Sequence, residues 1–316
     1  MTTTKLFNTQ EVSEMTEKLS CPNLEEADAL LLELFEEVQK WEGSLAGGRK
    51  LGMGAEAVES LRQSKVSFGH PRDRLIRLTE DTFKNSGTEL NEFYKQQMGE
   101  WDFYYMRLTV DLRPEPVAKF WRLTCELDFE PKGKGEPIVQ TLFPSQQWRS
   151  LMSFGVGMEV GLNGNLDWAI GVDNSELDRL LELLPEELKA NVSSKNDFKT
   201  FMAIAGYRYE LGRPEILTNG EGNSTCYWRI QDNQLQKIGT AKFGIVFKVP
   251  KGTASITVEG KVWAEPSINW LTSNLEDIVA KLSQKFQNLL GQDEEAASHF
   301  PRVCSKRWNF KLPQAV

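Results

Sequence analysis

The chain holds few of the residues on which nucleophilic or metal-dependent catalysis usually depends. It has two histidines, His70 and His299, and four cysteines that form no CxxC pair. Neither histidine belongs to a known catalytic motif with a serine or cysteine nucleophile, and the GxSxG and HExxH patterns are absent. We therefore predict no cofactor, no metal site and no histidine-dependent catalysis. Carboxylate chemistry stays open, because acids on neighbouring strands can lie at catalytic separations; the candidates are Glu126, Asp128, Glu159 and Asp167.

A candidate binding groove lies on a hairpin predicted from Phe154 to Asp173. Apolar residues alternate along 156–162 and along 166–172, and a three-residue loop at 163–165 keeps them on one face. Glycines, an alanine and acids make up the other face, which leaves room for a ligand or another element. The residues predicted for a ligand or partner groove are Glu159, Asp167, Asp173 and Trp168. The alternatives are a helix or sheet packed over the glycines, or an exposed edge without a role.

The C-terminal tail is a candidate surface for docking a partner. Residues 298–316 contain no acid, and their basic residues are interleaved with aromatic ones. Such a segment on a protein of net charge −8 could bind a partner. The residues predicted for this surface are Arg302, Lys306, Arg307 and Trp308. The simpler alternative is that the tail docks on the protein's own acidic surface as a last strand.

Helices are expected throughout residues 1–99. Residues 23–44 carry an apolar stripe at three- and four-residue steps, and Asn23 with Glu26 resembles a capped helix start. The outer face of this helix is strongly acidic. Further helices are predicted at about 55–63, 72–83 and 88–98. Arg72, Arg74 and Arg77 are expected to pair with the acidic first helix.

After Gly99 the apolar period changes from helical to alternating, which predicts strands. Two stretches, beginning at Tyr105 and Tyr227, share Tyr-x-Arg, Ala-Lys-Phe, Pro-Lys-Gly and Pro-Ser-x-x-Trp in the same order. We interpret them as a duplicated β-rich unit, with domains at 100–218 and 219–316. In the second copy, 243–249 is expected to form a hairpin with 254–260. A helix capped at Ser273 is expected to follow Trp270.

These patterns predict an α+β fold, with an N-terminal helical region followed by two related antiparallel hairpin-plus-helix units in a pseudo-symmetric, two-lobed body. The acidic net charge argues against general nucleic-acid binding. No apolar run reaches the roughly 20 residues that span a bilayer. Because the first residues lack an apolar signal core, we expect a cytoplasmic location and reduced thiols.

The function expected from these features is that of a non-enzymatic interaction protein, an adaptor or regulatory subunit that binds a protein partner. One alternative is an enzyme that uses strand carboxylates in the glycine-faced groove. Another is a protein that binds an apolar ligand or forms a pore, because long amphipathic hairpins can enter membranes. The sequence does not decide the oligomeric state.

Overall fold

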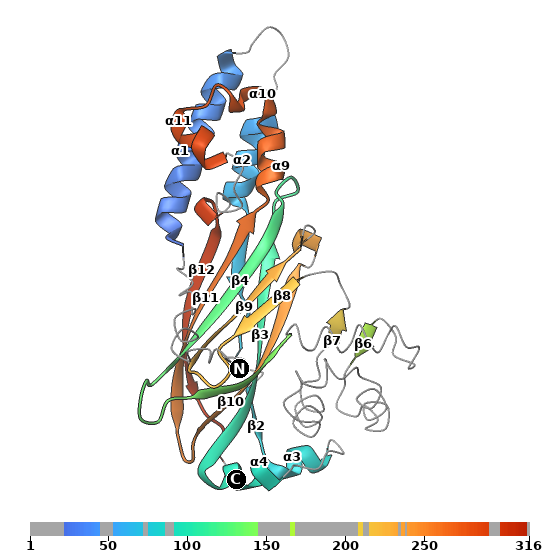
Figure 1. The fold of residues 1–316 in the computed structure, drawn as a ribbon, viewed down its shortest axis with the longest axis vertical. Helices are drawn as coiled ribbons and strands as arrows, with labels where there is room; N and C mark the ends of the chain where they lie inside the picture. The colour runs from blue at the N-terminus through green and yellow to red at the C-terminus, as the bar shows by residue number, and fades with distance from the viewer. Residues whose placement is uncertain are drawn as a thin grey trace, which may run out of the picture.

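A computed structural model describes the protein over ten ranges of the chain. They are residues 22–44, 53–71, 75–85, 92–144, 165–167, 208–210, 215–232, 235–237, 239–290 and 298–314. Helices gather at one end of the long axis, and the long strands run from there toward the other end, where two short helices lie (Figure 1). The predicted α+β class, with N-terminal helices and antiparallel sheets, is confirmed.

The first helix, α1 (Leu24–Ser44), begins and ends as predicted. The Asn23 side chain caps it: its Oδ1 accepts the Glu25 N–H at 3.0 Å, and its Nδ2 donates to Glu26 Oε1 at 3.0 Å. The apolar stripe is buried against α2 (Met53–Gln63) and the rest of the helical end. Glu42, near the end of α1, in turn accepts the Gly54 N–H at 2.9 Å, so one helix caps the next.

Two short strands interrupt the region that was expected to be helical. They are β1 (Lys65–Phe68) and β2 (Leu75–Leu78), and both pair with β3 (Trp101–Arg113). The predicted helix over 72–83 is therefore wrong; the helices that follow are α3 (Glu80–Asn85) and α4 (Glu92–Glu100). Pairing with a long strand outweighs a weak helical pattern over so few residues. Arg77 pairs with Asp102 rather than with α1, while residues 72–74 lie outside the described ranges.

Two antiparallel sheets form the body. Sheet A has the order β1-β3-β10-β5, with β2 also on β3, and sheet B has the order β12-β11-β4-β9-β8. A separate short pair joins β6 to β7, and one 3-10 turn, η3, lies at Leu235–Lys237. The remaining strands are β4 (Phe120–Glu130), β5 (Ile138–Phe143), β6 (Asn165–Asp167), β7 (Arg208–Glu210), β8 (Glu215–Asn219), β9 (Thr225–Gln231), β10 (Thr240–Pro250), β11 (Ser255–Pro266) and β12 (Arg302–Lys311).

The main core lies between the two sheets and is rich in aromatic residues. Trp228 of sheet B packs on Phe243 of sheet A with ring centroids 4.9 Å apart, and Phe129 packs on Phe247 at 5.1 Å. Both pairs join the sheets face to face, as in other two-layer β structures. The alternating strand predicted around Cys125 is confirmed as β4, whose inward side chains are fully buried.

The repeated Pro-Lys-Gly segments mark the corners where the chain changes sheets. One follows β4 in sheet B and leads to β5 in sheet A, and the other follows β10 in sheet A and leads to β11 in sheet B. The predicted hairpin between β10 and β11 is therefore wrong, because β10 pairs with β3 and β5 while β11 pairs with β4 and β12. A polar turn that contains Pro and Gly suits either connection, so its composition does not distinguish a hairpin from a corner.

The second Pro-Ser-x-x-Trp segment is the start of a helix. Ser267 is the N-cap of α9 (Ile268–Asn274), and its Oγ accepts the Trp270 N–H at 3.4 Å. The predicted cap at Ser273 is wrong: that hydroxyl lies inside the helix and donates to the Asn269 carbonyl at 2.6 Å. Two short helices, α10 (Glu276–Val279) and α11 (Gln284–Leu290), follow. In the first Pro-Ser-x-x-Trp segment, the residues from Ser145 onward lie outside the described ranges.

Candidate functional site: a groove between two sheet edges

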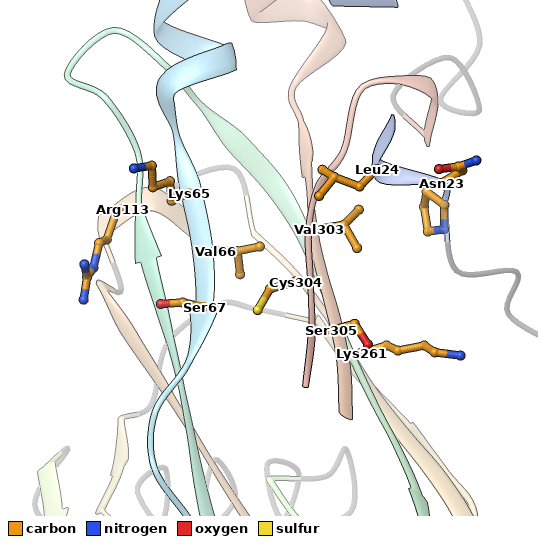
Figure 2. Close-up of a pocket in the computed structure, with 11 residues that line it drawn as sticks. Asn23, Leu24, Lys65, Val66, Ser67, Arg113, Lys261, Val303, Cys304 and Ser305 are labelled. Carbon is orange, nitrogen blue, oxygen red and sulfur yellow. The ribbon is translucent and has the colours of Figure 1, made fainter. Parts of the chain in front are cut away.

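The last strand of each sheet lies beside the last strand of the other. β1 ends sheet A and β12 ends sheet B, and no ladder joins them among the described residues. The two strands run in the same direction. At one end, Arg302 Nε donates to the Ser64 carbonyl at 3.1 Å, and at the other the rings of Phe68 and Trp308 meet with centroids 5.1 Å apart. A groove lies along these contacts and is lined by residues of β1, β12 and the start of α1 (Figure 2).

The ladder between β1 and β3 shows which backbone groups of β1 point into the groove. In an antiparallel pair, alternate residues exchange hydrogen bonds with the partner strand, and the residues between them point the other way. Gly69 N–H donates to the Thr109 carbonyl at 2.8 Å, so the odd-numbered residues of β1 bond to β3. The N–H and C=O of Val66 consequently point to the open edge.

The same reasoning applies to β12. Leu312 N–H donates to the Ala254 carbonyl at 2.9 Å, which places the even-numbered residues of β12 in the ladder with β11. The N–H and C=O groups of Val303 and Ser305 therefore point away from β11, to the outer edge of sheet B. Exposed strand edges of this kind offer ready hydrogen-bond partners to another chain.

The groove has an apolar floor. Its volume is about 600 Å³, within the range of small-ligand and peptide sites. The side chains of Val66 and Cys304 project toward each other from the two strands, while Val303 and Leu24 lie on the other side of β12 (Figure 2). Leu24, the first residue of α1, is 37% exposed, so a ligand could reach this apolar surface.

Three cations rim the groove, and its lining includes no described carboxylate. Lys65 and Arg113 project on the β1 side and Lys261 on the β12 side (Figure 2). Lys65 and Arg113 are directly opposite each other in the β1–β3 register, an arrangement in which two like charges repel. Two of the three cations have an acid nearby: Arg113 lies 3.9 Å from Asp111, and Lys261 lies 3.5 Å from Glu259. These exposed pairs contribute little to stability.

The described cysteines are free, and they differ in accessibility. Cys125 and Cys226 are buried in sheet B, and burial raises the pKa of both thiols. A thiol that resists ionisation is a poor nucleophile. Cys304 is half-buried and lines the groove, where its sulfur adds to the apolar floor.

The predicted groove on residues 154–173 falls mostly outside the described ranges. Glu159, Trp168 and Asp173 are among the residues not described. Of this segment, only the backbone of residues 165–167 is described. It forms β6, and Asp167 is opposite Arg208 in the β6–β7 ladder. The binding role of these residues stays a prediction.

The C-terminal tail forms β12, which confirms the alternative that it docks as a last strand on its own protein. Of the four residues predicted for partner docking, Trp308 is buried, and Arg302 and Arg307 form ion pairs with acids of this chain. Lys306 and Arg307 are exposed on the strand. Docking through these residues stays a prediction, although Arg302 now closes one end of the groove.

The strand carboxylates lie on the outer face of sheet B, away from the groove floor. Glu126 is opposite Lys261, and Asp128 is opposite Glu259. Burial raises the pKa of Glu126, which Lys261 partly offsets, while Asp128 and Glu259 raise it further. Burial also raises the pKa of Glu265, which receives hydrogen bonds from the side chains of neighbouring residues. Within the described ranges, these acids and the Cys and His residues form no group that could hold a metal ion.

A second hollow, of about 350 Å³, lies between α1, α2 and Arg302. Its charged side chains neutralise one another: Arg302 pairs with Asp28, and Arg62 pairs with Glu59 at 2.6 Å. Because these charges are matched locally, this hollow offers a ligand less than the groove does.

Sequence reasoning missed the residues of the groove. Lys65, Arg113 and Lys261 belong to three distant segments, and only the register of two sheets brings them together. The one local signal was the alternation of polar and apolar residues at 65–68, which is too short to separate a strand from the end of a helix.

Comparison with known proteins gives no family. No family model matches the chain, and neither does any curated protein. Among solved structures, a chain described as a pore forming protein matches 65% of this chain over 79% of its own length, at 5% identity and a TM-score of 0.30. Delta-toxin of Clostridium perfringens matches 64% over 78%, at 9% identity and a TM-score of 0.29. Likeness this low assigns no function.

The helices add one further fact. Among those in the described ranges, none combines the length and the apolar character that crossing a membrane requires.

Proposed function

We propose that the protein is a non-enzymatic, cytoplasmic adaptor or regulatory subunit that binds a protein partner at the β1–β12 groove. The observation that supports this most is the pair of adjacent sheet edges, which no ladder joins among the described residues. Proteins commonly cover or blunt such edges to avoid pairing with other chains. Here β12 is ten residues long and, among the described residues, is hydrogen-bonded in a ladder on one side only, to β11.

The groove lining supports binding rather than catalysis. The floor is made of aliphatic side chains and a thiol, and the charged groups that rim it are Lys and Arg side chains. Apolar surface that stays partly exposed and is surrounded by polar residues is a common feature of protein interaction sites. Glu126, whose pKa is raised, is opposite the rim residue Lys261, but neither it nor Glu265 lines the groove.

Charge reversal at Lys65 tests this proposal. Lys65→Glu removes a rim cation and creates an opposite-charge pair with Arg113, so the fold should be kept while partner binding is lost. The matched control is Lys281→Glu, an exposed position that does not line the groove. Proteins that co-purify with the wild type and the control, and not with Lys65→Glu, would then be purified and their dissociation constants measured.

Two outcomes would overturn the proposal. One is recovery of the same partners, with equal affinity, by all three proteins. The other is a monomer that recovers no partner but releases dye from liposomes, which would favour the pore-forming alternative.

A further inference from the structure

The edge of sheet B opposite the groove indicates a second interaction surface. Sheet B ends in β12 on one side and in β8 on the other (Figure 1). Among the described residues, β8 pairs with β9 alone. We propose that β8 pairs with β8 of a second copy of this chain, which joins two copies of sheet B edge to edge. This inference does not depend on the function proposed for the β1–β12 groove.

The ladders of sheet B show which backbone groups of β8 are open. Asp232 N–H, directly after β9, donates to the Trp121 carbonyl of β4 at 2.8 Å. The even-numbered residues of β9 therefore bond to β4, and its odd-numbered residues bond to β8. Odd-numbered residues of β9 are opposite odd-numbered residues of β8. The N–H and C=O groups of Ile216 and Thr218 consequently point to the outer edge.

These open groups fit a two-fold pairing centred on Leu217. Two antiparallel copies of β8 can set Ile216 opposite Thr218 of the second copy, where the two residues would exchange hydrogen bonds. The same register sets Leu217 opposite Leu217 of the second copy, in the kind of pair whose side chains lie closest together. Each contact then occurs twice, as a two-fold dimer requires.

The side chains of β8 favour this register. Leu217 is 48% exposed, whereas the neighbouring Ile216 is buried on the inner face of the sheet. A shift of two residues in either direction would set Leu217 opposite Glu215 or Asn219, so the apolar contact selects the central register. In that register Glu215 is opposite Asn219 of the second copy, and no like charges are directly opposite each other.

The sequence around β8 favours one closed pair over longer assemblies. β8 has five residues, and Pro214, directly before it in the sequence, has no N–H to continue a ladder. The other edge strand of sheet B, β12, exposes Lys306 and Arg307, and charged residues of this kind protect an edge from pairing. Because the contact is smaller than the roughly 1,200 Å² of stable complexes, we expect a weak dimer.

Sedimentation velocity of the full chain, at concentrations from micromolar to submillimolar, tests the pairing. The wild type should form a dimer as its concentration rises. Leu217→Lys and Leu217→Glu should each weaken dimerisation at least about tenfold, because like charges then meet at the two-fold axis and the apolar contact is lost. An equimolar mixture of the two variants should recover the dimer, since opposite charges then face each other.

The matched control is Ile76→Lys. Ile76 is 46% exposed on β2, which among the described residues also pairs on one side only, with β3. This variant should dimerise like the wild type. Amide exchange by NMR is a second measurement that needs no variant. The N–H groups of Ile216 and Thr218 should become more protected as the concentration of the wild type rises.

A wild-type chain that stays monomeric at submillimolar concentration would overturn the inference, because β8 would then be free or would pair with a different protein. A dimer that Leu217→Lys leaves intact, or that Ile76→Lys dissociates, would also overturn it. So would a mixture of the two folded Leu217 variants that does not associate. These results leave the test of the proposed function unaffected, since neither Leu217 nor Ile76 lines the β1–β12 groove.

Discussion

Phe68 of β1 and Trp308 of β12 meet edge to face, with ring centroids 5.1 Å apart and an interplanar angle of 81°. Both side chains are buried. They lie over Gly260 of β11, where an added β-carbon would be 2.6 Å from Trp308 and 3.0 Å from Phe68. This contact holds β1 against β12 without a ladder between them, and so defines one end of the groove.

Gly260→Ala should destabilise the protein by about 1–3 kcal/mol, because the new methyl group cannot fit unless the Trp308 ring moves. Gly43→Ala in α1 is the matched control: nothing lies within 4 Å of its added β-carbon, and a helical alanine should leave stability unchanged or raise it by up to about 1 kcal/mol. Urea denaturation measures both. Equal midpoints for the two variants would show that the ring contact is not tightly packed.

Asp102→Asn should cost about 3–5 kcal/mol. The Asp102 carboxylate is 4% exposed; it accepts Arg77 NH2 at 2.6 Å and the N–H of Gly252 at 3.0 Å. Removing its charge leaves the half-buried Arg77 without a counter-ion and loosens the corner that leads from β10 to β11. The control is Glu92→Gln, an exposed pair partner of Lys95, which should change stability by less than about 0.5 kcal/mol. Thermal or urea unfolding that gives similar values for the two would contradict this account of the corner.

Ser267→Ala should lower stability by about 0.5–2 kcal/mol, because the Trp270 N–H loses its capping acceptor. Ser273→Ala should have almost no effect, since that hydroxyl only bonds back to a carbonyl within α9. Chemical denaturation of the two variants side by side decides which serine is the cap. A larger loss at Ser273 would restore the cap predicted from the sequence.

Glu126→Gln should make the protein more stable at neutral pH, by no more than about 1 kcal/mol because the group is only half-buried. Its pKa is raised above 4.5 in the folded state, chiefly by burial. A carboxyl of this kind holds its proton more tightly when folded, so the folded state loses stability as pH rises from 4.5 through the raised pKa. The advantage of the variant should therefore shrink as pH falls toward 4.5. Unfolding free energies from pH 4 to pH 8 test this; a difference that does not vary with pH would contradict it.

Local sequence patterns correctly predicted the elements that one helix or one buried sheet face determines. The cap at Asn23 and the stripe of α1 are set within one helix, and the alternation of β4 reflects one sheet with one buried face. β1 and β2 were missed because four residues carry little periodic signal, and both depend on pairing with β3. The groove could not be predicted, because it exists only where two sheets end side by side.

The most direct test of the central claim, that the β1–β12 groove is a binding surface, is amide exchange by NMR with and without the partner. The N–H groups of Val66, Val303 and Ser305 point away from their ladders, so they should exchange quickly in the free protein. Binding should protect these three amides and leave their neighbours in the ladders unchanged. Saturating binding that leaves all three exchanging at the free rate would contradict the account.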